Sequence, residues 1–190
     1  MKTVIITGSC GLVGSESVYF FSKKGFQVVG IDNNSRKLFF GKDGDITWIK
    51  NKLLKEVKNY NHYNIDIKNF NTLKKIFLKY RKNIKLIIHC AAQPSHDWAK
   101  DKPFIDFQIN AQGTLNLLDL TKKYCKQSPF IFMSTNKVYG DNPNFLPLQE
   151  KKTRWEIKKN HKYFRGIDET MSLDNCVHSF FGVSKSYGDL

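Results

Sequence analysis

A glycine-rich turn between a buried strand and a helix constrains this chain more than any other feature. Residues 3–7 form a short β-branched apolar run, which predicts a strand buried on both faces. Gly8, Gly11 and Gly14 follow it in G-x-x-G-x-x-G spacing and open an amphipathic segment that reaches Lys24. Such glycines allow a tight turn, the approach of a pyrophosphate to the backbone, and close packing of the helix on the sheet. The turn therefore predicts a dinucleotide site at the N-terminus of the first helix.

A carboxylate closes the second predicted strand. Asp32 lies 18 residues after Gly14, where a carboxylate can accept hydrogen bonds from the adenosine ribose. It would repel a 2′-phosphate, so the residues favour NAD over NADP. Arg36 favours the opposite choice, because an arginine can accommodate that phosphate. Asp66 follows the third predicted strand and is either an acceptor for the adenine amino group or a solvated loop acid.

Strands and helices alternate five times along the chain. This rhythm requires crossover connections, so we expect an α/β fold with a Rossmann-type doubly wound parallel sheet. The further predicted strands span residues 27–32, 60–65, 86–90 and 130–134. The further predicted helices span residues 48–58, 70–80, 104–125 and 179–190.

The segment 140–175 breaks this rhythm, because it is polar, charged and proline-containing. A loop of this length without periodicity is usually functional, so we expect it to lie on the substrate side of the site. The last predicted helix reaches Leu190 with neither a cap nor a following strand. We therefore expect residues 1–190 to be one nucleotide-binding domain of a longer protein, with a C-terminal substrate domain absent.

Composition narrows the set of partners. The 31 Lys and Arg residues against 17 Asp and Glu residues give a formal charge of +14. The lysines lie on predicted helix faces and no nucleic-acid-binding motif accompanies them, so we expect an anionic small ligand and no nucleic acid. No apolar stretch approaches the roughly 20 residues that cross a membrane, so we expect no membrane partner. The cysteines have no metal-ligand spacing and are expected to be reduced, which predicts no metal site and a cytoplasmic location; they are Cys10, Cys90, Cys125 and Cys176.

Several further motifs carry a family resemblance. They are Asp32-Asn33-Asn34, Asp66-Ile67, His89-Cys90-Ala91-Ala92-Gln93, Asn110 with Gly113-Thr114-Leu115-Asn116-Leu117-Leu118, and Ser134-Thr135-Asn136-Lys137-Val138-Tyr139-Gly140. Together with the glycine turn, they resemble the extended short-chain dehydrogenase/reductase family of NAD-dependent nucleotide-sugar epimerases and dehydratases. The later segments resemble its CDP-paratose 2-epimerase branch, also called CDP-tyvelose epimerase; they are Thr153-Arg154, Gly166-Ile167-Asp168-Glu169 and His178.

The resemblance implies a role for each matching position. Thr135 would hydrogen-bond the reacting hydroxyl, and Lys185 would hold the nicotinamide ribose and depress the pKa of its catalytic partner. The implied substrate-binding residues are Thr135, Asn136, Lys137 and Arg154, although Arg154 is equally well explained as an exposed loop charge. The implied cofactor-binding residues are Gly8, Cys10, Gly11, Leu12, Val13, Gly14, Asp32, Asn33, Asn34, Arg36, Asp66, Ile67, Ala91, Ala92, Gln93, Asn110 and Lys185.

One position departs from the family pattern. The catalytic tyrosine is expected four residues before Lys185, where this chain has Phe181. A phenyl ring can neither accept nor donate a proton, so the general base is unassigned. His178 could titrate near neutrality, although a structural role explains it better. Tyr187 lies about 60° short of two full helical turns from Phe181, so we expect it not to reach the site.

These observations predict an NAD-dependent epimerase of a nucleotide-diphosphate sugar, with a CDP-sugar favoured. The enzyme would act by transient oxidation to a keto-sugar. A dehydratase or reductase of nucleotide sugars remains an alternative, and so does a catalytically silent protein that binds NAD or a nucleotide sugar. The resemblance also implies a homodimer that pairs through the long helix and the last helix.

Overall fold

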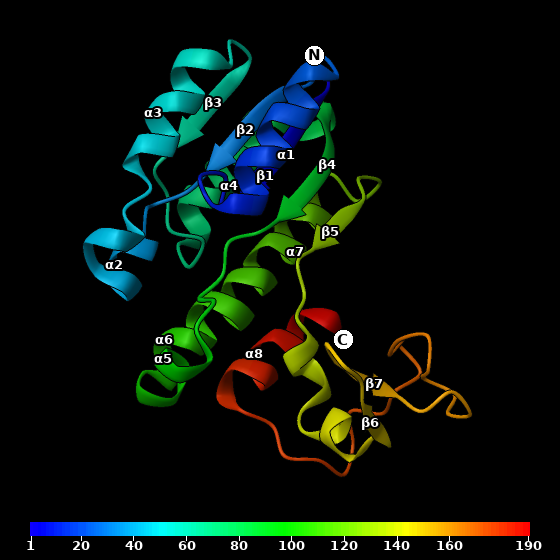
Figure 1. Cartoon of the computed structure of the whole chain (residues 1–190). Helices are drawn as coiled ribbons and strands as arrows, with labels where there is room; N and C mark the ends of the chain where they lie inside the picture. Colours follow the sequence, from blue (N-terminus) through cyan, green and yellow to red (C-terminus); the bar gives the residue numbers. More distant parts are fainter.

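The computed structural model describes residues 1–190. Its main sheet has five strands in the order β3-β2-β1-β4-β5, and every neighbouring pair is parallel (Figure 1). The predicted α/β fold with a doubly wound parallel sheet is therefore confirmed. The strands are β1 (Thr3–Thr7), β2 (Gln27–Ile31), β3 (Tyr60–Tyr63), β4 (Ile84–His89) and β5 (Phe130–Phe132).

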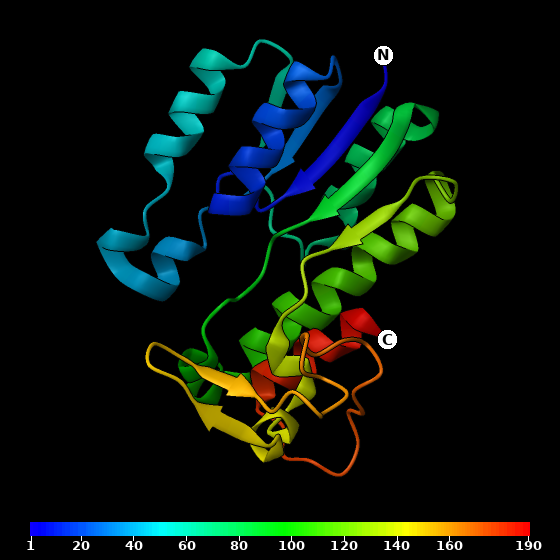
Figure 2. The same ribbon diagram turned by 45° about the vertical axis from the view of Figure 1, so that its right-hand side comes forward.

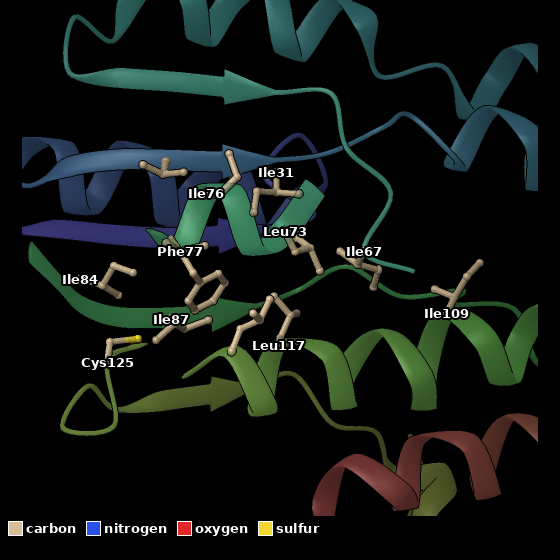
Figure 3. Close-up of a cluster of buried hydrophobic side chains, with 13 residues drawn as sticks. Ile31, Ile67, Leu73, Ile76, Phe77, Ile84, Ile87, Ile109, Leu117 and Cys125 are labelled. Atoms are coloured by element: carbon tan, nitrogen blue, oxygen red, sulfur yellow. The ribbon is translucent and has the colours of Figure 1, made fainter. Parts of the chain in front are cut away.

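Helices cover both faces of this sheet (Figure 2). Successive side chains of a strand point to opposite faces, so a buried parallel strand needs apolar residues at every position. In β1, Ile5 packs toward α4 (Phe70–Tyr80) and α7 (Gly113–Tyr124), in the cluster drawn in Figure 3. Val4 and Ile6 pack in the other cluster, with α1 (Leu12–Lys23) and α3 (Thr47–Glu56).

The helix predicted over residues 104–125 is interrupted. It divides into α6 (Pro103–Phe107), a π turn (Gln108–Gln112) and α7. Two short helices, α2 (Arg36–Phe40) and α5 (His96–Asp101), follow β2 and β4 and were not predicted. The last helix, α8 (Phe180–Asp189), begins as expected, because the Ser179 side chain accepts a hydrogen bond from the Gly182 amide at 3.1 Å.

The segment 140–175 is more ordered than its composition suggests. It contains an antiparallel hairpin of β6 (Leu148–Glu150) and β7 (Trp155–Ile157). Two short 3₁₀ turns lie at or near its start, at 136–139 and 142–145, and two more lie elsewhere in the chain, at 41–44 and 81–83. Both views place the hairpin and α8 beyond the carboxyl end of β5, which is the end of the sheet where the site lies (Figures 1 and 2). None of the helices combines the length and apolar composition that crossing a membrane requires.

Candidate dinucleotide-binding site

A pocket opens at the carboxyl ends of the first four strands, which is where ligands bind in open α/β sheets. It is lined by the turns after β1, β2, β3 and β4, so residues far apart in the sequence meet there. The residues that were predicted from the sequence and line the pocket are Gly8, Gly11, Leu12, Val13, Gly14, Asp32, Asn33, Arg36, Asp66, Ile67, Ala91 and Ala92.

The glycine turn is built so that only glycine fits at two of its positions. Gly8 has φ +64°, and a Cβ there would stand 2.7 Å from the Ala91 amide nitrogen. A Cβ on Gly14 would overlap the carbonyl oxygen of Gly8. The first turn of α1 has no side-chain cap, which leaves its amide groups available to an anion. This uncapped cradle of bare backbone fits the pyrophosphate of a dinucleotide.

The Asp32 carboxylate is oriented by backbone amides. Its Oδ2 accepts a hydrogen bond from the Cys10 amide at 3.0 Å, and its Oδ1 accepts one from the Asn34 amide at 2.8 Å. Each oxygen retains acceptor capacity, because a carboxylate offers about four lone-pair sites in total. The carboxylate is therefore fixed at the edge of the pocket and can accept further hydrogen bonds from ribose hydroxyls.

The side chain of Cys10 points away from the pocket. It lies 1% exposed beside Tyr60 and His62, and burial raises the pKa of the thiol to about 11. Its backbone amide orients Asp32, and that is its contribution to the site. Asn34 acts similarly through its backbone, while its side-chain amide donates to Asp45. Neither side chain lines the pocket.

Gln93 and Asn110 also lie outside the pocket lining. Both side chains are buried, with exposures of 0% and 1%. The backbone N–H of Gln93 donates to Asn110 Oδ1 at 3.0 Å, and Asn110 Nδ2 donates to the backbone carbonyl of Gln93 at 3.1 Å. The two hydrogen bonds hold the loop after β4, which also carries the lining residues Ala91 and Ala92, against the π turn.

Lys185 belongs to α8, and its buried ammonium group reaches the end of β5. Its Nζ donates to the Met133 carbonyl at 2.6 Å and lies 4.2 Å from the centroid of the Phe132 ring. The side chain is 4% exposed, and burial lowers the pKa of the amine to about 8. Phe181 stands one helical turn earlier in α8, also buried. No phenol accompanies Lys185 at this position.

The predicted substrate-side residues are divided between two places. Thr135 follows β5, two residues after Met133, and its hydroxyl caps the 3₁₀ turn that carries Asn136 and Lys137, at 3.3 Å from the Lys137 amide. Arg154 lies in the β6–β7 hairpin and donates to Glu156 at 2.6 Å. None of these four residues lines the pocket.

The sequence matches an established family over most of its length. The sequence model described as the NAD dependent epimerase/dehydratase family matches residues 4–165. The chain is 34% identical to the CDP-paratose 2-epimerase of Salmonella typhi over 186 residues, which cover 98% of this chain and 50% of that protein. The chain belongs to the NAD-dependent epimerase/dehydratase family.

Other relatives of the family agree with this assignment. A UDP-glucuronate 4-epimerase of Thermodesulfobacterium geofontis is 34% identical over 149 residues, covering 76% of this chain and 43% of that protein. The UDP-Glc/GlcNAc 4-epimerase structure from Campylobacter jejuni shares the fold, with a TM-score of 0.71 at 21% identity, over 100% of this chain and 47% of that one. The chain thus spans about half the length of the relatives it matches. The predicted cofactor, NAD, is the cofactor of this family.

The structure also identifies pocket residues that the sequence analysis missed. Apolar side chains at the strand ends could have been found, because each directly follows or ends a predicted strand. Phe39 lies in α2 and Pro94 lies just before α5. The sequence predicted neither of these short helices, so it gave no signal for these two residues. The lining residues not predicted are Ile31, Ser35, Phe39, Ile46, Ile65, Cys90, Pro94 and Ile109.

His178 forms a hydrogen bond within the segment that precedes α8. Its Nε2 lies 2.9 Å from the Leu173 carbonyl and 3.1 Å from Cys176 Sγ. The carbonyl can only accept, so Nε2 carries the proton in this arrangement and the ring holds the segment together. Tyr187, on the last turn of α8, is 43% exposed and does not line the pocket.

Proposed function

We propose that this chain binds NAD and epimerises a nucleotide-activated sugar of the CDP-paratose type, through transient oxidation to a keto-sugar. The observation that carries the proposal is the uncapped glycine cradle with the oriented Asp32 carboxylate at the same edge of the sheet. The similarity to a CDP-paratose 2-epimerase over 98% of the chain supports the choice of nucleotide and sugar.

Bound NAD would supply reversible hydride transfer at a sugar carbon, so the net redox change over the whole reaction would be nil. The residues of this chain would bind and orient the reactants. Lys185 would hold the nicotinamide ribose and Thr135 would hydrogen-bond the sugar hydroxyl. Asn136, Lys137 and Arg154 would contact the diphosphate, which suits amide and cationic donors. Arg154 would first have to leave Glu156.

A second candidate function is a catalytically silent protein that binds NAD or a nucleotide sugar. The buried ring of Phe181 favours it, because hydride removal from an alcohol also requires a proton acceptor for the hydroxyl. In this candidate, Lys185 contributes to binding only.

Three further proposals concern the oligomeric state, the location and the domain organisation of the chain. We propose a homodimer, because apolar side chains on α7 and α8 are exposed: Leu115 by 48%, Leu118 by 37% and Val183 by 53%. We propose a cytoplasmic location, since all four cysteines are free. We propose that residues 1–190 act as one NAD-binding domain, with residues 140–175 on the substrate side.

The test compares the wild-type chain with Phe181→Tyr, each loaded with NAD and given a CDP-sugar. Appearance of NADH absorbance followed by the epimerised sugar in NMR spectra supports the epimerase. Activity in Phe181→Tyr alone favours the silent protein as the native state, whereas activity in the wild type requires a proton acceptor other than residue 181. Absence of NAD binding in both proteins would overturn the proposal.

A further inference from the structure

One carboxylic acid is completely enclosed by the elements that hold Lys185. Asp106, on α6, is 0% exposed. Its Oδ1 accepts hydrogen bonds from Gln93 Nε2 and Asn110 Nδ2, both at 3.0 Å. Its Oδ2 is buried and has no hydrogen-bond partner. Two neutral donors on one oxygen and none on the other would be poor compensation for a buried negative charge.

The hydrogen-bond partners of Asp106 carry no charge that would compensate a buried carboxylate. The network around it is uncharged, since Gln93 and Asn110 are amides and Ser184 is a hydroxyl. Lys185, on α8, is the charged group that favours ionisation of Asp106, but its ammonium donates to the Met133 carbonyl instead. Burial raises the pKa of the Asp106 carboxyl and outweighs the opposing effects of Ser184, Lys185 and Asn110.

The network joins three separate elements. Asn110 Nδ2 lies within hydrogen-bond distance of Asp106 Oδ1, of the Gln93 carbonyl and, at 3.2 Å, of Ser184 Oγ. Gln93 belongs to the loop after β4, Asn110 to the π turn and Ser184 to α8. A π turn widens the helix by one residue and is frequent at functional sites. Ser184 is the direct neighbour of Lys185, so whatever holds Ser184 holds the backbone of Lys185.

We propose that Asp106 is a positioning residue, held as an uncharged carboxylic acid, that fixes α8 through Asn110 and Ser184 and thereby fixes the Lys185 amine. The uncharged acid keeps both amide donors satisfied and adds no negative charge beside Lys185. Any contribution of Asp106 to catalysis or to NAD binding rests on the proposed function, in which Lys185 holds the nicotinamide ribose of NAD. The position and protonation of Asp106 itself do not depend on that role.

The experiment uses Asp106→Asn, Asp106→Ala and, as a control for charge removal, Asp101→Asn at an exposed position on α5. Carbon-13 NMR of labelled aspartate side chains reports the protonation of Asp106 in the wild type. Nitrogen-15 NMR of labelled lysine side chains follows the titration of Lys185. Hydrogen exchange measures the protection of α8, and calorimetry measures NAD affinity.

Asp106 is expected to give the signal of a protonated carboxyl group at pH 7. Asp106→Asn, which has the same shape and no charge, should leave the Lys185 titration midpoint at its wild-type value, as should Asp101→Asn. Asp106→Ala should expose Lys185 to water, so its midpoint should rise toward the ordinary value of about 10.4. Amide exchange in α8 should then accelerate at least about tenfold, because two buried donors lose their acceptor.

Three results would overturn the proposal. The first is an ionised Asp106 signal at pH 7. The second is a Lys185 midpoint that falls in Asp106→Asn, since this would mean that a negative charge had been removed. The third is an Asp106→Ala variant whose α8 exchange and Lys185 titration match the wild type. Failure of the wild type to bind NAD would contradict the proposed function alone, because the three NMR and exchange readouts need no cofactor.

Discussion

The ammonium of Lys185 donates a 2.6 Å hydrogen bond to the carbonyl of Met133 and so ties α8 to the end of β5. The amine stands where the family resemblance expects a lysine, but the ring one turn earlier is the phenyl group of Phe181. The Lys185 amine is therefore a buried cation whose pKa is lowered by burial, and residue 181 provides no phenol beside it. This relationship explains why NAD binding and turnover must be tested separately.

Replacing Lys185 with methionine should change how stability depends on pH. The folded pKa of about 8 lies below the ordinary value of about 10.4, so between these pH values the unfolded chain binds more protons than the folded chain. The free energy of unfolding of the wild type should therefore rise through this window, by at most about 1.4 kcal/mol per pH unit. Lys185→Met should lack this rise in urea titrations, whereas Lys122→Met, at an exposed position on α7, should retain it. Equal pH profiles for Lys185→Met and the wild type would contradict the buried amine.

His89 should make the fold sensitive to acid. Its ring is 1% exposed and lies between Thr7 Oγ1 at 2.6 Å and Thr114 Oγ1 at 2.9 Å. Burial lowers its pKa to about 3, so the folded chain resists a proton that the unfolded chain accepts below about pH 6.5. Stability should therefore fall as the pH drops from about 6.5 toward 3.

The measurement is thermal unfolding at a series of pH values for the wild type and for His89→Gln. The variant should lose part of the acid sensitivity, because its side chain keeps a donor and an acceptor but cannot titrate. His96→Gln is the control, since that histidine is exposed on α5. An identical loss of acid sensitivity in both variants would show that the effect does not come from His89.

Two glycine substitutions should separate folding from binding. A Cβ on Gly14 would overlap the Gly8 carbonyl, so Gly14→Ala should destabilise the chain by more than about 2 kcal/mol or prevent folding. A Cβ on Gly11 would meet the same carbonyl oxygen at 3.3 Å, which requires only a small adjustment. Gly11→Ala should fold and lose NAD affinity, because the methyl group would occupy the approach of the pyrophosphate. Thermal unfolding and calorimetry report the two effects, and a Gly11→Ala variant with unchanged NAD affinity would contradict this orientation of the ligand.

The sequence predicted the parts of the fold in which local pattern and burial agree. Strand β1 and helix α4 match their predicted bounds, because one is uniformly buried and the other has a regular apolar stripe at Leu73, Ile76 and Phe77. The β6–β7 hairpin was not predicted, since its strands have three residues each and their pattern is too short to read.

The parts of the site that depend on backbone geometry could be predicted from the sequence. The parts that depend on how side chains pack against distant residues could be predicted less well. The glycine turn and Asp32 follow from their spacing to β1 and β2. The side chain of Gln93 is held by Asp106, 13 residues away, and its backbone is held by Asn110, 17 residues away. Asn110 lies in a π turn that no periodicity in the sequence shows. Nothing in the local sequence indicates that Asp106 is buried, because only tertiary packing encloses it.

Calorimetric titration of the wild type and Asp32→Asn with NAD tests the central claim most directly, with the exposed Asp43→Asn as control. We expect the wild type and Asp43→Asn to bind NAD alike. We expect Asp32→Asn to bind at least about tenfold more weakly, because hydrogen bonds to a charged acceptor contribute about 1.5–3 kcal/mol. Folded wild-type protein that shows no binding heat and releases no nucleotide on denaturation, or equal affinity in Asp32→Asn, would contradict the account.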